Sequence, residues 1–311
     1  MNRSTSLYGI YACIFSNILL VLSLLVTTAA HAGSAVPSRD APSLDPNVIA
    51  AASGTHVVKG EDGVVTIGWP RTDVPVTVDG LKLPPPAGLG SWAAFMPTPD
   101  GAMVMGDTVV FQDEVDAAMD AAFAHGLQVS ALHNHFFYSD PPVFFMHING
   151  HGDSAALAEG VQAVWAAIRL VRERQPSPAH NFAGGVPVPG RLDAVAISRA
   201  LGQPVKDIQG VLKASIGRTS TMDGTTIGAT MGLTTWIAFV GSDRLAVADG
   251  DFIMYGRDVQ DVLHALRSAG FHVVALHNHM IGEKPTVYFT HFWGKGLALD
   301  LARGFKSALE A

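Results

Sequence analysis

Apolar and polar positions follow two different periods along this chain. Short apolar runs bounded by Pro, Asp and Gly predict strands over residues 92–96 and 103–111. Over residues 113–125 the apolar positions recur at helical spacing, with acidic residues in the first turn and Gly126 directly after the last turn. The pattern therefore predicts two strands followed by an amphipathic helix.

Beyond this helix the pattern returns to the period of a strand. Residues 127–138 predict a strand, residues 139–141 a turn, and residues 143–149 the return strand of a hairpin. Residues 153–174 again have helical spacing. Strand, helix, hairpin and helix in this order predict an antiparallel sheet with helices packed against it, and hence an α+β fold.

This pattern occurs twice. Trp92-Ala-Ala-Phe95 recurs as Trp236-Ile-Ala-Phe239, and Leu132-His-Asn-His135 recurs as Leu276-His-Asn-His279, both at an offset of 144 residues. Without a gap, residues 92–160 match residues 236–304 at 24 of 69 positions, which is far more than chance would give. A period this long indicates duplicated domains rather than a solenoid. We therefore expect two tandem homologous repeats that form one pseudo-symmetric body.

Domain boundaries follow from the repeat. Residues 176–191 contain four prolines and three glycines, a composition typical of a linker. The first repeat is then expected over residues 33–175 and the second over residues 192–311. Both lengths are near the usual size of a domain.

The N-terminus predicts export. Arg3 precedes an apolar run over residues 10–26, and the segment ends in Ala30-His31-Ala32 before Gly33. This is the pattern of a secretory signal peptide, here residues 1–32. An uncleaved anchor is the alternative, but the apolar core is short of the roughly 20 residues that a membrane span needs. We expect a secreted or periplasmic protein with no stable membrane span after cleavage.

Composition narrows the partners and the chemistry. Cleavage after Ala32 leaves 19 basic and 27 acidic residues, a formal charge of −8, which disfavours nucleic acid and anionic membranes as partners. The single cysteine, Cys13, lies in the predicted signal peptide. The mature chain is therefore expected to use no disulfide, and any metal site must use His, Asp, Glu or Asn. The motifs of P-loop enzymes and of nucleophile-elbow serine hydrolases are absent.

Histidines are the most informative side chains. Because side chains alternate along a strand, His133 and His135 are expected on the same face. If the hairpin is centred near Asp140, His147 lies directly opposite His133, with the two Cβ atoms about 4.5 to 5.5 Å apart. The second repeat has the same set at the same spacing, namely His277, His279 and His291.

Three converging imidazoles are typical of a metal site. Neutral imidazole binds zinc, copper, nickel or iron, and three protein ligands with one open position characterise catalytic zinc sites. We expect a divalent transition metal in each repeat, with zinc as one candidate. The acids present in both copies are candidates for a fourth ligand or a catalytic acid or base: Asp107 and Asp251, and Glu114 and Asp258. The alternative, that the histidines are hydrogen-bonded residues of a core or cleft, stays open.

The block around the histidines resembles a known family. Leu-His-Asn-His, followed by a proline, a Phe-rich strand and Phe-x-His-x-x-Gly-x-Gly, is similar to the LppY/LpqO family of bacterial exported proteins. The similarity spans nearly all of the mature chain and both copies. It implies an exported protein with a duplicated domain of unknown function, and it implies no activity, substrate or catalytic residue. Many members are lipoproteins, whereas this chain lacks a lipobox cysteine, which favours soluble export.

Two functions of different classes fit these features. The first is a metal-dependent hydrolase of the cell envelope. The second is a non-catalytic, two-lobed binding protein for an envelope polymer, a peptide or a metal ion, in which duplication provides avidity. A purely structural role, with metal-free histidines, is a third. The surroundings of the histidines differ between the halves, with His151 at the position of Lys295, which favours one active and one modified site.

Overall fold

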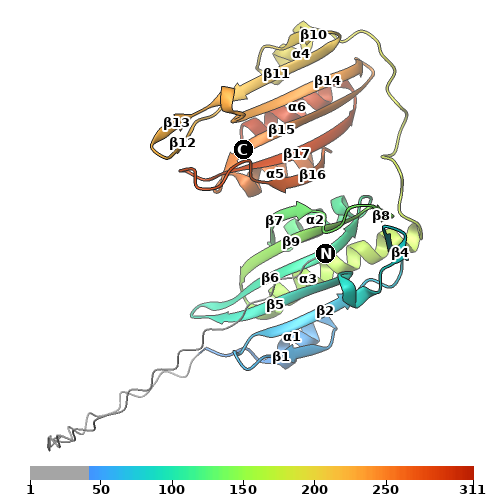
Figure 1. Cartoon of the computed structure of the whole chain (residues 1–311), viewed down its shortest axis with the longest axis vertical. Coiled ribbons are helices and arrows are strands. Elements are labelled where there is room, and N and C mark those ends of the chain that lie inside the picture. Colours follow the sequence, from blue (N-terminus) through green and yellow to red (C-terminus); the bar gives the residue numbers. More distant parts are fainter. Residues whose placement is uncertain (1–41) are drawn as a thin grey trace, which may run out of the picture. The chain divides into compact units, whose positions relative to one another are not determined.

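The computed structural model describes residues 42–311, so the predicted signal peptide lies outside the described residues. Helices and antiparallel sheets are mixed along this part of the chain (Figure 1). Each named strand pair in it is antiparallel, which confirms the prediction of helices with antiparallel sheets.

The first repeat begins with a short helix and ends with a long one. Its elements in chain order are α1 (Pro46–Ser53), β1 (Val57–Lys59), β2 (Val65–Pro70), β3 (Thr77–Val78), β4 (Leu81–Lys82), the 3-10 helix η1 (Pro85–Ala87), β5 (Gly90–Thr98), β6 (Gly101–Phe111), α2 (Val115–Ala124), β7 (Gln128–His133), β8 (Ser139–Asp140), β9 (Val143–Gly152) and α3 (Ser154–Arg174).

The second repeat has nearly the same order of elements. These are α4 (Ala194–Leu201), β10 (Lys206–Ile208), β11 (Val211–Gly217), β12 (Ser220–Met222), β13 (Thr225–Ile227), the 3-10 helix η2 (Ala229–Met231), β14 (Thr234–Ser242), β15 (Leu245–Tyr255), α5 (Val259–Ser268), β16 (His272–His277), β17 (Val287–Gly296) and α6 (Ala298–Leu309).

One twelve-stranded sheet runs through both repeats. Its order is β1-β2-β5-β6-β9-β7-β16-β17-β15-β14-β11-β10. Counted inward from either edge, corresponding strands of the two repeats occupy corresponding places. The repeats meet where β7 lies beside β16, and Leu132 pairs with Leu276 there.

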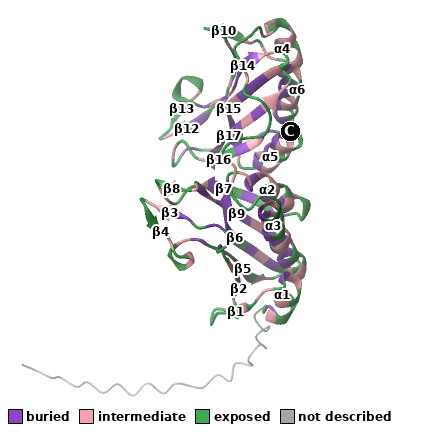
Figure 2. Cartoon of the chain, turned by 90° about the vertical axis from the view of Figure 1, so that its right-hand side faces the viewer, coloured by how far each residue is buried: buried purple, intermediate pink, exposed green. Residues whose placement is uncertain are grey.

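Helices lie along one face of this sheet (Figure 2). The main core fills the space between the two layers and contains Trp165 of α3 and Phe305 of α6 together with strand residues such as Phe95 and Phe239. By length and composition α3 could cross a membrane, but its apolar stripe is part of this core.

The opposite face of the sheet carries two smaller apolar clusters. Val109 and Phe145 belong to the cluster of the first repeat, whereas their chain neighbours Val110 and Met146 belong to the main core. Since side chains alternate across a strand, the small cluster must lie on the face away from the helices. Asp107 and His147 are two residues from Val109 and Phe145 on the same strands, so they project from this open face too.

Two details of the predicted hairpin are wrong. β7 ends at His133 instead of residue 138, and β8 pairs with β3 instead of forming a turn, so its backbone groups are satisfied by a different strand. His147 pairs with Ala131 instead of His133, and His133 pairs with Phe145. The register is thus shifted by two residues. Because the shift is even, His147 keeps the predicted face.

Candidate metal centre

In the first repeat, four polar side chains meet on the open face of the sheet. Asp107 of β6 pairs directly with His147 of β9, and Asp107 Oδ2 lies 3.8 Å from Nε2 of both His147 and His135. The ring of His133, at the end of β7, has its centroid 5.1 Å from that of His135 and 5.0 Å from that of His147. Three imidazoles and one carboxylate therefore share one small volume.

The second repeat has the same arrangement in a tighter form. Asp251 of β15 pairs with His291 of β17, and Asp251 Oδ2 lies 3.3 Å from His279 Nε2. The ring centroid of His277 is 5.2 Å from that of His279 and 5.0 Å from that of His291. Donor atoms of Asp251, His277 and His279 all lie within 4.8 Å of one another, close enough to hold a metal ion.

A phenylalanine holds the histidine that lies beyond the strand. The ring of His135 stacks on Phe145 with centroids 3.3 Å apart and an interplanar angle of 6°. In the second repeat His279 stacks on Phe289 at 3.4 Å and 8°. These phenylalanines belong to the small apolar clusters. The clusters therefore orient His135 and His279, which lie beyond the ends of β7 and β16.

Backbone carbonyl groups orient three of the other four imidazoles. Nδ1 of His277 lies 3.3 Å from the carbonyl oxygen of Asn278, and Nδ1 of His291 lies 3.1 Å from that of Gly250. In the first repeat Nδ1 of His133 lies 3.4 Å from the carbonyl oxygen of Asn134. Because a carbonyl oxygen only accepts, this arrangement favours the tautomer with the proton on Nδ1 and a free lone pair on Nε2.

Burial leaves several polar atoms of these clusters without a partner. Oδ1 of Asp107, Oδ1 of Asp251 and Nε2 of His277 are buried and accept or donate no hydrogen bond. An unpaired buried polar group costs free energy, so each such atom requires an explanation, and an ion bound between them is one. The chemistry of the donors, imidazole nitrogen and carboxylate oxygen, fits a divalent transition metal.

Burial also shifts the pKa values in the direction that suits metal binding by histidine. Burial lowers the pKa of His279 below its ordinary value, although the nearby charge of Asp251 opposes this, and it lowers the pKa of His135 in the same way. Burial raises the pKa of Asp251. The lowered histidine pKa values keep these imidazoles neutral at neutral pH, and neutral imidazole is the form that binds a metal.

The structure does not bring Glu114 and Asp258 to the histidines. Glu114 is fully buried, accepts from both Nη atoms of Arg71 at 2.9 Å, and accepts from the backbone N–H of Phe111 at 2.8 Å. Asp258 pairs with Arg218 at 3.1 Å. Phe111 is four residues beyond Asp107, roughly 13 Å along the strand. These two acids therefore tie the start of α2 and α5 to the loop residues Arg71 and Arg218.

The second repeat has an acidic residue near its histidine cluster that has no acidic counterpart in the first repeat. Asp249 precedes Asp251 by two residues on β15 and so lies on the same face, opposite Trp293 of β17. The pKa of Asp249 is raised above its ordinary value, because the effect of burial outweighs the opposing charges of Lys213 and His291. Its counterpart in the first repeat is Met105, so a search for acids present in both copies passes over it. An acid at an alternate position of the strand that carries Asp251 is the signal that could have found it.

A protein-family model matches residues 48–167 and again residues 195–311. The chain belongs to the family described as Domain of Unknown Function (DUF1259). The two DUF1259 matches confirm the predicted duplication and the unknown-function class of the domain.

No curated protein matches the chain. Among solved structures, one match is the crystal structure of a trimeric bacterial microcompartment shell protein PduB, at 12% identity over 82% of this chain and 91% of that one. Its TM-score of 0.22 carries no argument for the DUF1259 protein.

Proposed function

We propose that this protein is a metal-binding protein of the cell envelope, in which each DUF1259 repeat holds one divalent transition metal ion. The observation that carries this proposal is the cluster in the second repeat, where donor atoms of Asp251, His277 and His279 lie within 4.8 Å of one another. The proposed donors are His277, His279, His291 and Asp251 in the second repeat and His133, His135, His147 and Asp107 in the first.

Zinc is the ion that we propose to test first. Imidazole and carboxylate donors suit zinc, and a site with three histidines leaves room for a carboxylate or a substrate as the fourth ligand. Copper, nickel and iron also bind imidazole, so the identity of the ion is an outcome of the experiment.

We further propose that the second repeat catalyses hydrolysis. A bound ion would supply Lewis acidity to a carbonyl or phosphoryl oxygen. Asp249 would act as the general base, because it lies two residues from Asp251 on the same strand face, and burial raises the pKa of its carboxyl group. Met105 cannot transfer a proton, so the first site would bind a metal without turnover.

The location in the envelope rests on the N-terminal sequence. The signal-peptide pattern of residues 1–32 and the resemblance to LppY/LpqO proteins both support export, and they make an envelope component or a small molecule the expected ligand. The corresponding strand orders in the two halves of the sheet support the expected pseudo-symmetric arrangement.

The second candidate function is non-catalytic binding by two lobes. It is favoured by one observation, that both histidine clusters lie on the open face of one continuous sheet, where an extended ligand could contact both. Two linked sites would increase affinity without any chemistry. Turnover of a substrate separates this candidate from the hydrolase.

Elemental analysis by ICP-MS of the mature protein, residues 33–311, tests metal binding. We expect nearly two equivalents of one transition metal in the wild type, about one in each of the single variants His133→Ala and His277→Ala, and almost none in the double variant. Absence of metal from the wild type, even after reconstitution with zinc, copper, nickel and iron salts, would refute the proposal. Assays of the metal-loaded protein on chromogenic esters and phosphoesters then test hydrolysis.

A further inference from the structure

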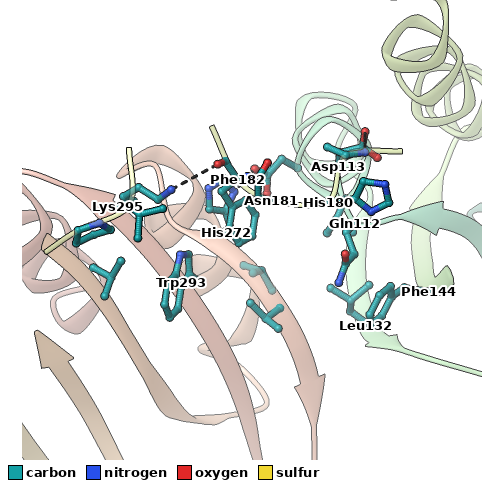
Figure 3. Close-up of a pocket in the computed structure, with 18 residues that line it drawn as sticks. Gln112, Asp113, Leu132, Phe144, His180, Asn181, Phe182, His272, Trp293 and Lys295 are labelled. Atoms are coloured by element: carbon teal, nitrogen blue, oxygen red, sulfur yellow. Dashed lines mark hydrogen bonds and ion pairs between the residues drawn. The ribbon is translucent and has the colours of Figure 1, made fainter. Parts of the chain in front are cut away.

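A cavity of about 470 Å³ lies where the linker passes between the two repeats, and no residue proposed to bind metal lines it (Figure 3). Its volume falls within the range of small-molecule binding sites. Six apolar residues from three segments form much of its wall: Leu132 and Phe144 of the first repeat, Phe182 and Pro187 of the linker, and Val273 and Trp293 of the second repeat. Such a wall favours an apolar chain or ring as the body of a ligand.

The linker wall is held in place by contacts on both sides. The ring of Phe182 stacks on His272 of β16 with centroids 3.9 Å apart and an interplanar angle of 14°. The backbone N–H of Ala179 donates to Asp113 at 3.0 Å, and the backbone N–H of Gly190 donates to the carbonyl oxygen of Gly241 at 3.0 Å. The segment that closes the cavity is therefore anchored before and after it.

The acidic side chains of the wall already have cationic partners. Asp113 forms an ion pair with Arg172. Asp116 pairs with Arg267 at 2.8 Å and also contacts Nδ1 of His272. Both carboxylates are thus engaged by the protein, but Arg172 also pairs with Glu114 and Arg267 also pairs with Asp120.

Lys295 is the cation of the wall that lacks such a partner. Within residues 42–311 its ammonium group forms no ion pair, and it donates one long hydrogen bond of 3.4 Å to the carbonyl oxygen of Phe182. Figure 3 shows the Lys295 side chain reaching toward Phe182 at one side of the cavity. The Lys295 side chain is partly buried beside this apolar space, and a carboxylate at ordinary distance would form a stronger hydrogen bond with its ammonium group than the long bond to a carbonyl oxygen.

The two repeats do not contribute equivalent side chains to the cavity. At the repeat offset, Lys295 corresponds to His151 and Trp293 corresponds to Asn149, and neither counterpart lines the cavity. The difference between Lys295 and His151 therefore changes the wall of the cavity, and it involves no residue proposed to bind metal.

We propose that this cavity binds a small amphipathic carboxylate, with its apolar chain or ring against the linker and its carboxylate on Nζ of Lys295. One ammonium group matches one negative charge, which favours a monoanionic carboxylate over a phosphate monoester. The proposed carboxylate site uses no residue proposed to bind metal, so its test does not require a metal.

Isothermal titration calorimetry of the mature protein with decanoate and with its neutral analogue decanamide tests the proposal. We expect decanoate to bind with one-to-one stoichiometry and decanamide to bind roughly tenfold to a hundredfold more weakly, which is the range for a hydrogen bond to a charged group. Lys295→Met should weaken decanoate binding by the same factor, and Lys295→Arg should retain most of it. His151→Met, the matched substitution in the first repeat, should leave decanoate binding unchanged.

Three results would overturn the proposal. The first is no saturable heat with decanoate, and the second is equal affinity for decanoate and decanamide in the wild type, a comparison that needs no variant to fold. The third is tighter binding of decyl phosphate than of decanoate, which would assign the cavity to phosphate esters instead.

Discussion

Asp249 is the side chain that most clearly separates the two clusters of histidines. Both clusters contain three imidazoles and a buried aspartate at equivalent positions, but only the second has another carboxylate on the same strand face. Burial raises the pKa of Asp249 against the opposing charges of Lys213 and His291. In the proposed function, metal binding and proton transfer would therefore belong to different residues.

Asp249→Asn should leave the metal content unchanged and should reduce turnover of any hydrolysed ester by about a hundredfold or more, since loss of a general base typically costs a factor of 10² to 10⁴. ICP-MS and initial rates on the same preparation measure both quantities. Met105→Asn, the equivalent change in the first repeat, is the control and should alter neither. Equal activity of Asp249→Asn and wild type would remove Asp249 from the chemistry.

The histidines could be predicted from sequence because their spacing recurs at the repeat offset, but the choice among the acids could not. Asp107 contacts His147 only because β6 and β9 pair in one particular register, 40 residues apart in sequence. Glu114 is equally repeated, yet it is bound by Arg71, whose position in a loop gave no signal. Pairing between distant strands decides which polar residues meet, and local patterns do not encode it.

At the scale of elements, two glycines let the strands beside the histidines approach closely. A Cβ atom at Gly250 would lie 2.1 Å from the carbonyl oxygen of Trp236 and 2.5 Å from Cζ of Phe292. At Gly106 the nearest atom, the carbonyl oxygen of Trp92, would be 2.8 Å away. Each glycine directly precedes the aspartate of its cluster, so packing of the strand and placement of the carboxylate are coupled.

Gly250→Ala should destabilise the protein by about 1 to 3 kcal/mol and lower the metal content of the second repeat, because β15 must shift away from β14. Gly106→Ala should have a smaller effect of the same kind. Urea denaturation and ICP-MS measure the two consequences. Gly296→Ala is the control, since a Cβ there meets no atom within 4 Å. Wild-type stability of Gly250→Ala would contradict the close approach.

A buried ion-pair network fixes the loop after β2 to the start of α2. Nε of Arg71 lies 2.9 Å from Asp73 Oδ1, while its Nη atoms contact Glu114. Burial by itself raises the pKa of Asp73, but the hydrogen bonds and the charge of Arg71 outweigh it and hold the pKa below its ordinary value. Asp73 is therefore a stabilising group in its ionised form.

The sign of the pH dependence follows from this lowered pKa. The stabilisation by Asp73 is fully present above the pKa of the unfolded state, about 3.8, and is lost as the pH falls through the lower folded pKa. Asp73→Asn should thus be about 1 kcal/mol less stable than wild type at pH 7, a small figure because the carboxylate is partly exposed. The difference should shrink below about pH 3.8 in urea denaturation series. A difference that is constant with pH would show that Asp73 acts by packing alone.

At the scale of the whole molecule, the two repeats are joined by side chains at equivalent positions that make different contacts. Gln260 of α5 forms both backbone hydrogen bonds of Val129 that a neighbouring strand would otherwise form. Its Nε2 donates to the carbonyl oxygen of Val129 at 2.8 Å, and its Oε1 accepts from the N–H of Val129 at 3.0 Å. Its counterpart Asp116 of α2 pairs with Arg267 and His272. Residue pairing between β7 and β16 themselves is limited to Leu132 and Leu276 among the described strands.

The double variant Asp116→Ala/Gln260→Ala should separate the unfolding of the two repeats. We expect one cooperative transition for wild type in differential scanning calorimetry and two resolved transitions for the double variant, since the removed contacts connect the repeats. Asp261→Ala, an exposed neighbour on α5, is the control and should keep the single transition. One transition at the wild-type midpoint in the double variant would show that the remaining contacts, among them the ion pair of Arg267 with Asp120, are enough to couple the repeats.

The tandem arrangement also determines how the two histidine clusters can change. In a homodimer built from one repeat, a mutation alters both subunits at once, because they share one gene sequence. Here both clusters lie on a single chain, so position 105 is methionine while the equivalent position 249 is aspartate. Because the two copies are fused, a single mutation can change one cluster and leave the other unchanged.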